Sequence, residues 1–199
     1  MQFEKGYIYH IYNQGNNRQN IFFNRDNYIY FLNKIKTYIT PYVDILAWCL
    51  MPNHFHLMVL VKKDKLDSKT LGVSLRHAES YRTFNSSIGI MLMSYTKAIN
   101  KQQDRTGKLF REQTKAECVN CPNGITPSFY NTKTGIVMNI SNPDQEYPQI
   151  CFNYIHQNPV KACIVKNVID WEFSSAVDYL GLREGKLINR EVAKEYGLI

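Results

Sequence analysis

The chain has 199 residues, of which 44% are hydrophobic and 21% charged, a composition that describes a folded globular protein and excludes a disordered one. Its longest apolar run, residues 49–61, is too short to span a membrane and contains two histidines, and the first ten residues lack the apolar stretch of a signal peptide. We therefore expect a cytoplasmic, nucleoid-associated protein whose five cysteines are thiols, and the net charge of +7 favours a polyanionic partner.

The first half of the chain alternates between strand and helix patterns. Residues 6–15 are β-branched and aromatic and end in Asn-Gln-Gly, so they predict a strand that runs into a turn. Residues 25–39 carry apolar side chains at three- and four-residue spacing, which predicts an amphipathic helix. The apolar runs 43–51 and 54–61 flank Pro-Asn and predict a hairpin.

The second half is more irregular. Residues 67–103 predict mostly helix, broken into two near Gly72, Phe84–Ser87 and Gly89, and residues 108–119 predict a strand. Residues 120–148 are rich in Asn, Pro, Gly and Thr, which predicts a loop with a small hairpin. Residues 147–165 predict a helix that meets a proline, and the tail ends in a charged helical segment.

The element order predicts the fold class. Strand–helix–strand–strand–helix–strand is typical of an α+β, ferredoxin-like (RRM-like) antiparallel sheet with helices on one face and the other face free for a substrate. We expect one domain over residues 1–166, with an insertion around 120–148, and a C-terminal extension over 167–199 packed on the same domain.

The first candidate site is the pair His54 and His56. Residues two apart on a strand point to the same face, so both imidazoles project together while Phe55 and Leu57 face the core. Two adjacent imidazoles suit a divalent metal, although an H-x-H motif is also compatible with simple packing. A binuclear hydrolase motif and an H-E-x-x-H helix are both absent from the sequence.

The second candidate site is the segment NYIHQNPVKA, residues 153–162. Tyr154 and Asn158 share one face of the predicted helix, with Gln157 beside them, and could supply a nucleophile and a third metal ligand. Asn158 is equally compatible with a helix cap, because it precedes a proline and residues before proline avoid helical dihedrals.

Four motifs, MPNHFHL, SYTKAINKQQDRTGKLF, YIHQNPVKA and WEFSS, occur in this order and resemble those of the REP-associated tyrosine transposases, a branch of the single-tyrosine HUH transposases. The resemblance implies that His54 and His56 bind Mg²⁺ or Mn²⁺, that Tyr154 is the nucleophile, and that Asn158 (or Gln157 instead) completes the metal site. It further implies cleavage and transfer of single-stranded DNA near hairpins through a 5′-phosphotyrosine, by a monomer or homodimer that needs no small-molecule cofactor.

The chain departs from the family pattern at one point of this motif. The alanine of NPVKA is usually followed by glycine, and Cys163 stands there instead. We expect an altered turn after the helix, since glycine permits backbone dihedrals that cysteine does not. Cys118 and Cys121 form a C-x-x-C motif without a second pair nearby, which argues against structural zinc.

Basic side chains near these motifs are candidates for tracking a DNA strand, although each is also compatible with a solvated surface charge. The candidates are Arg18, Arg105, Lys108, Arg111 and Lys161. His10 and His77 are interpreted as structural, and His156 is placed outside the metal site because it is out of phase with Tyr154.

Two other functions fit the same fold. A domesticated protein could bind DNA hairpins without cutting them, although the complete set of site residues argues against this. An RNA-binding RRM module is disfavoured, because its aromatic-basic consensus does not occur and a histidine pair has no purpose in it.

Overall fold

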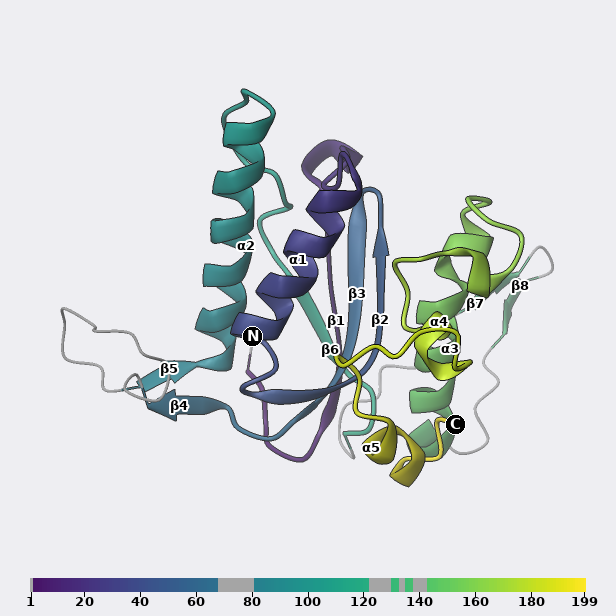
Figure 1. The fold of residues 1–199 in the computed structure, drawn as a ribbon. Helices are drawn as coiled ribbons and strands as arrows, with labels where there is room; N and C mark the ends of the chain where they lie inside the picture. Colours follow the sequence, from purple (N-terminus) through teal and green to yellow (C-terminus); the bar gives the residue numbers. More distant parts are fainter. Residues whose placement is uncertain (1, 68–80, 122–129, 133–134, 138–142) are drawn as a thin grey trace.

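The computed structural model describes residues 2–67, 81–121, 130–132, 135–137 and 143–199. Its centre is a four-stranded antiparallel sheet in the order β2-β3-β1-β6 (Figure 1). The strands are β1 (Ile8–Gln14), β2 (Val43–Met51), β3 (His54–Val61) and β6 (Lys115–Cys118). This order, with the first strand in the interior, confirms the predicted ferredoxin-like α+β fold.

Helices α1 (Arg25–Tyr38) and α2 (Phe84–Gln102) cover one face of this sheet. Each helix begins at a side-chain cap: Asn24 accepts a hydrogen bond from the backbone of Asn27, and Thr83 accepts one from Ser86. Alternate residues of the central strands point towards these helices and join the larger of two buried clusters, as the period of two along a strand requires.

The prediction for residues 67–103 is partly right: α2 is the second of the two expected helices, whereas most of the first lies outside the described residues, Gly72 included. Near the end of the expected first helix, strand β5 (Tyr81–Thr83) is found instead, paired with β4 (Lys65–Asp67). Helix α2 then runs through Gly89 without a break. A single glycine costs about 1 kcal/mol in a helix interior, and the long apolar face that α2 buries outweighs this loss.

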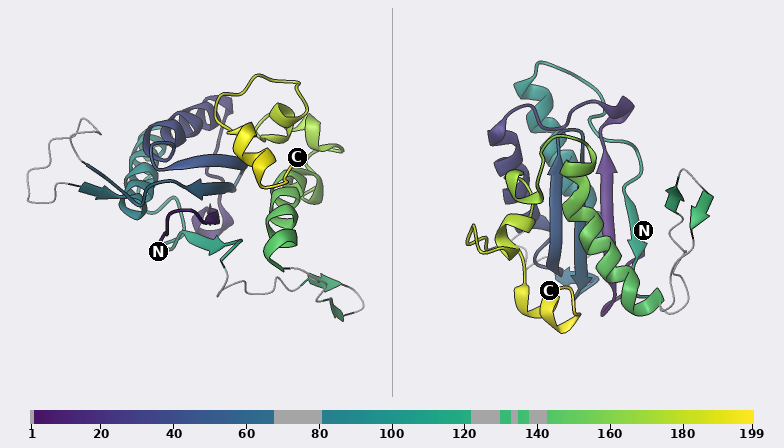
Figure 2. Two further views of the ribbon diagram at one scale, coloured as in Figure 1. Left: turned by 90° about the horizontal axis from the view of Figure 1, so that it is seen from below. Right: turned by 90° about the vertical axis from the view of Figure 1, so that its right-hand side faces the viewer.

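Helix α3 (Pro143–Lys161) crosses the second face of the sheet diagonally (Figure 2, right). Its side chains Cys151, Phe152 and Ile155 form a second buried cluster with Cys49 of β2 and Met58 of β3. The expectation that this face is free for a substrate is therefore only half right. The half over β2 and β3 is covered by α3, because α3 has an apolar stripe to bury.

The C-terminal extension contains the short helices η2 (Val168–Asp170), α4 (Ala176–Tyr179) and α5 (Arg190–Glu195). It joins the outer edge of β2: Leu50 N donates to Phe173 O at 2.9 Å, Trp48 N donates to Ser175 Oγ at 2.9 Å, and Asn189 N donates to Ile45 O at 2.8 Å. The WEFSS motif therefore satisfies backbone groups of an edge strand that would otherwise be unpaired.

Strands β7 (Tyr130–Thr132) and β8 (Gly135–Val137) form the small hairpin that was expected within residues 120–148. Where this region begins, Cys118 and Cys121 are joined by a disulfide, so the prediction of five thiols is wrong for this pair. The turn after β6 brings their Cα atoms to 5.7 Å, within the range that a disulfide requires. The thiol state was predicted from the expected cell compartment alone, and such a prediction takes no account of the distance between two cysteines.

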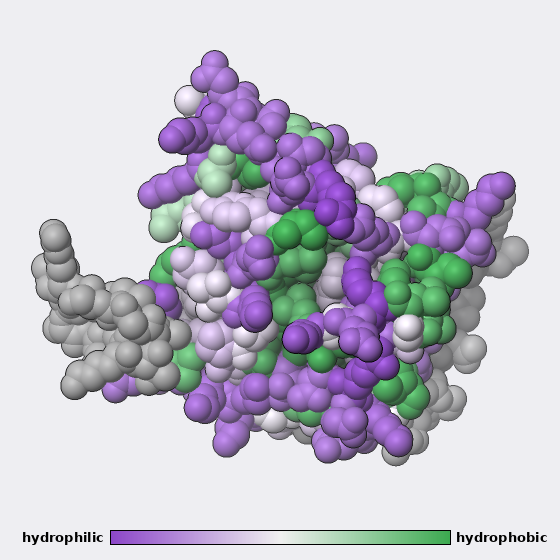
Figure 3. All heavy atoms as spheres, in the orientation of Figure 1, coloured by the Kyte–Doolittle hydropathy of each residue, from purple (hydrophilic) through white to green (hydrophobic). Residues whose placement is uncertain are grey.

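The surface in Figure 3 is dominated by hydrophilic residues, which gather over the free end of α2. Within the described residues, no helix combines the length and the apolar content needed to cross a membrane.

Helix α3 ends in a turn that has the geometry of a glycine turn although no glycine is present. Cys163 has φ of 55°, in the left-handed region, and Ile164 N donates to Pro159 O at 3.0 Å to close the turn. The turn after the helix, which we expected to be altered, therefore has its usual form, and Cys163 adopts a strained backbone conformation in it.

We predict that Cys163→Gly stabilises the protein by about 1 kcal/mol, because glycine enters the left-handed region without the steric penalty of a Cβ atom. Urea unfolding of the two proteins measures the difference. Cys163→Ala is the matched control, since it removes the thiol but keeps the Cβ atom. Equal stabilisation by both substitutions would contradict the backbone explanation.

Candidate active site

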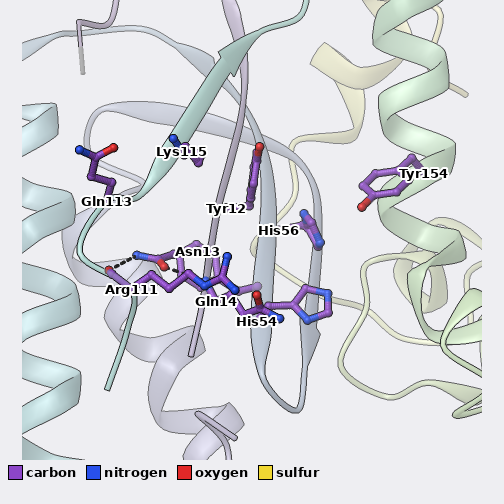
Figure 4. Close-up of a pocket in the computed structure, with 10 residues that line it drawn as sticks. Tyr12, Asn13, Gln14, His54, His56, Arg111, Gln113, Lys115 and Tyr154 are labelled. Atoms are coloured by element: carbon purple, nitrogen blue, oxygen red, sulfur yellow. Dashed lines mark hydrogen bonds between the residues drawn. The ribbon is translucent and has the colours of Figure 1, made fainter. Parts of the chain in front are cut away.

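His54 and His56 lie side by side on the face of β3 that points away from α1 and α2. Their ring centroids are 5.0 Å apart, and both residues line a cavity of about 360 Å³. Figure 4 shows this cavity between the sheet and α3, with Tyr154 directed towards the histidines. The structure therefore brings the two predicted half-sites together, although they lie far apart in the sequence.

His56 is 5% exposed and has one paired and one unpaired ring nitrogen. Its Nδ1 lies 2.8 Å from Nε2 of His10, whereas its Nε2 has no hydrogen-bond partner among the described residues. Burial lowers the pKa of His56 well below the usual value, so the ring is neutral at pH 7. A neutral imidazole with a buried, unpaired nitrogen is suited to binding a cation.

His54 is held by its neighbour in the hairpin turn. Its Nδ1 lies 2.6 Å from the side-chain oxygen of Asn53, so Nδ1 carries the proton and Nε2 carries the lone pair. Burial lowers the pKa of His54, and a side-chain hydrogen bond with Asn158 acts in the opposite direction. The Asn158 side chain therefore lies within interaction distance of the His54 ring.

Asn158 lies inside α3, one turn after Tyr154. Its side chain is buried, and Nδ2 donates to the backbone oxygen of Tyr154 at 2.9 Å. The alternative in which Asn158 caps a helix is wrong, because α3 continues through both Asn158 and Pro159. Gln157 is exposed, whereas the buried side chain of Asn158 interacts with His54, so Asn158 is the better placed of the two candidate ligands.

Tyr154 is 37% exposed and stands edge-on to the histidines. Its ring centroid is 5.5 Å from that of His56, with the ring planes nearly perpendicular. Lys161, two turns further along α3, places its ammonium group 5.1 Å from the Tyr154 ring centroid. The Tyr154 ring therefore lies beside the imidazole of His56 and close to the positive charge of Lys161.

These donors fit a divalent cation. Two imidazole nitrogens and one amide oxygen form a mixed nitrogen and oxygen set that Mn²⁺ and related ions accept. No group of three or more His, Cys, Asp or Glu side chains suited to a metal occurs within the described ranges, so the candidate set depends on the amide of Asn158 as its third member. Such a set leaves coordination positions for oxygens of a bound phosphate.

The five predicted DNA-binding residues do not all lie at this cavity. Arg111 lines it, and Lys161 lies over Tyr154. Arg18 belongs to the 3₁₀ helix η1 (Asn16–Arg18), and Gln19 beside it donates to the backbone oxygen of Lys108 at 3.1 Å. Arg105 precedes Lys108 in the same exposed segment after α2. This segment and η1 meet at the end of the sheet where β2 turns into β3 (Figure 1).

The structure adds residues that the sequence analysis missed. Tyr12 of β1 and Lys115 of β6 face each other in the sheet and both line the cavity. His10, interpreted from sequence as structural, lies against His56, and His77 is outside the described residues. The alternation along β1 contained the signal for His10 and Tyr12, but its use requires the strand register, which a single sequence does not reveal.

His156 lies outside the site, as predicted. It is buried on the other side of α3 and its Nε2 lies 2.7 Å from Ser175 Oγ, so it links α3 to the C-terminal extension.

A comparison with solved structures finds the REP-associated tyrosine transposase bound to a REP hairpin, with a TM-score of 0.54 and 19% sequence identity over 88% of this chain and 79% of that chain. At this level of identity the likeness establishes a shared fold, and it confirms the family resemblance at that level. No protein-family model matches the sequence, and no curated protein matches it significantly.

The geometry predicts different effects for the two neighbouring amides of α3. Asn158→Ala should weaken Mn²⁺ binding by about 10-fold or more, since metal affinity falls by at least that much when supporting groups around a site are lost. Gln157→Ala is the matched control and should leave the affinity unchanged. Titration of each apoprotein with Mn²⁺ by electron paramagnetic resonance measures both values. A larger loss in Gln157→Ala would assign the third ligand to Gln157.

Proposed function

We propose that this protein is a transposase-type enzyme that cuts single-stranded DNA near hairpins and transfers the strand through a covalent 5′-phosphotyrosine. The observation that carries the proposal is the approach of Tyr154 to His56, whose Nε2 is buried and unpaired, with His54 and Asn158 alongside. The fold shared with a transposase bound to a REP hairpin supports hairpin DNA as the partner.

The first step is attack by the Tyr154 oxygen on the scissile phosphorus. Tyr154 gives up its phenolic proton as the bond from phosphorus to the tyrosine oxygen forms, the bond to the 3′ oxygen breaks, and the departing oxygen takes up one proton to become a 3′-hydroxyl, so the step is balanced. A divalent ion such as Mg²⁺ or Mn²⁺, when bound by His54, His56 and Asn158, supplies a Lewis acid that withdraws charge from the phosphate. One phosphodiester replaces another, so a second 3′-hydroxyl can reverse the step without ATP.

Tyr154 is a better nucleophile candidate than the other phenol at the cavity. The hydroxyl of Tyr12 donates to Glu117 at 2.6 Å, and burial together with this bond raises the pKa of Tyr12. Both effects disfavour the phenolate that must attack phosphorus. Tyr154 instead lies near Lys161, whose positive charge favours a developing phenolate.

The surroundings of the cavity suit an unpaired strand. Arg111 and Lys115 provide positive charge for the phosphate backbone, and the rings of Tyr12 and Tyr154 provide faces on which bases can stack. Because Tyr154 projects from a helix that lies over the sheet, the phosphate must enter the space between α3 and the sheet. A single strand can enter this space more easily than a duplex.

The proposal predicts a covalent protein–DNA adduct when the protein is incubated with single-stranded hairpin DNA and Mn²⁺, resolved by denaturing electrophoresis. Tyr154→Phe should abolish the adduct, and chelation of the metal should do the same. Tyr12→Phe is the matched control and should retain the adduct, because it removes a phenol from the same cavity.

An adduct that persists in Tyr154→Phe and disappears in Tyr12→Phe would move the nucleophile to Tyr12. Hairpin binding by the wild-type protein without any adduct would overturn the enzymatic proposal and favour a non-cleaving hairpin-binding protein of the same fold.

A further inference from the structure

His10 of β1 forms a closely stacked pair with His56 of β3. The ring centroids are 5.0 Å apart with 23° between the planes, and Nε2 of His10 lies 2.8 Å from Nδ1 of His56. Both side chains are almost fully buried, at 6% and 5% exposure. We propose that His10 is a positioning residue that holds His56 in the tautomer whose Nε2 is free to bind a cation; this inference rests on the proposed function.

The ability of His56 to bind a cation depends on where one proton lies. Two neutral imidazoles joined by a single hydrogen bond share one proton in that bond, carried either by Nδ1 of His56 or by Nε2 of His10. If His56 carries it at Nδ1, Nε2 of His56 has a lone pair. If His10 carries it, His56 must hold its own proton at Nε2 and cannot bind a metal there.

A bound cation favours the first arrangement. In both arrangements Nε2 of His56 lacks a hydrogen-bond partner among the described residues, which costs about 1–3 kcal/mol for a buried polar atom, but a cation satisfies the lone pair of the first arrangement and cannot satisfy the N–H group of the second. In the first arrangement His10 accepts the Nδ1 proton, as a carboxylate or carbonyl commonly does for metal-binding histidines.

A purely structural role for His10 would predict something different. An apolar residue at position 10 would fill the same space against Tyr12, whose ring centroid is 4.8 Å from that of His10. It would leave Nδ1 of His56 without a partner and free to lose its proton to Nε2. A test of the proposal must therefore remove or keep the hydrogen-bond acceptor at position 10, independently of the volume of the side chain.

The matched pair of substitutions is His10→Phe and His10→Gln. Phenylalanine keeps a ring but removes the acceptor, whereas the side-chain oxygen of glutamine reaches the place of the imidazole Nε2. We expect His10→Phe to weaken Mn²⁺ binding by the apoprotein by about 10- to 100-fold, the usual effect of losing an outer hydrogen-bond partner. His10→Gln should restore binding close to the wild-type affinity. These titrations contain no DNA and do not depend on catalysis.

A spectroscopic measurement tests the same idea without a substitution at His10. Long-range ¹H–¹⁵N correlation spectra of the wild-type apoprotein should show His56 protonated at Nδ1, with the ring signals assigned by their loss in His56→Ala. Protonation of His56 at Nε2 would overturn the positioning role, and this measurement holds even if His10→Phe does not fold.

The outcomes separate this inference from the proposed function. If the wild type and His56→Ala bind Mn²⁺ equally, the metal site itself is wrong. If His56→Ala loses binding while a folded His10→Phe keeps the wild-type affinity, only the positioning role of His10 is wrong.

Discussion

The packing of α3 across the sheet is the interaction on which the site depends. Cys151, Phe152 and Ile155 anchor the helix on β2 and β3, and the same helix carries Tyr154 and Asn158 on the neighbouring face. A helix whose stripe of apolar residues is fixed cannot rotate, so its polar face is held over the histidines. Burial of the apolar side chains of α3 therefore fixes the positions of Tyr154 and Asn158 on its neighbouring face.

The C-terminal extension supports this arrangement from the far side. Tyr179 packs against Phe152 with ring centroids 5.1 Å apart, and Ser175 contacts both His156 of α3 and the backbone of Trp48 in β2. The extension thus holds α3 and the edge strand together. We infer that the WEFSS motif acts in positioning and takes no part in the reaction.

Much of the site could be predicted from local patterns, whereas its completion required tertiary information. The alternation around His54 and His56 predicted a shared strand face, and the helical spacing of Tyr154 and Asn158 predicted a shared helix face, because both periods are local properties. The place of His10 depends on the register between β1 and β3, which is set by pairing of distant segments. The cover that α3 gives to half of the sheet is likewise a tertiary property.

The same distinction explains the errors in the fold. Strand β5 lies within the range predicted to be helical, and its pairing with β4 from an earlier part of the chain overrides local preference. The disulfide after β6 depends on a short distance between two Cα atoms, which the sequence alone does not reveal. At Cys163 the local preference is overridden as well. Cysteine is poorly suited to left-handed backbone dihedrals, but it adopts them here because the end of the helix and the following chain require them.

The central claim is that His54, His56 and Asn158 hold one divalent ion beside Tyr154. Anomalous diffraction from crystals of the wild-type protein soaked in Mn²⁺ tests it most directly. The account predicts a single strong manganese peak within bonding distance of Nε2 of His54, Nε2 of His56 and the side-chain oxygen of Asn158. A well-ordered site with no manganese there, or with the ion bound away from both histidines, would contradict it.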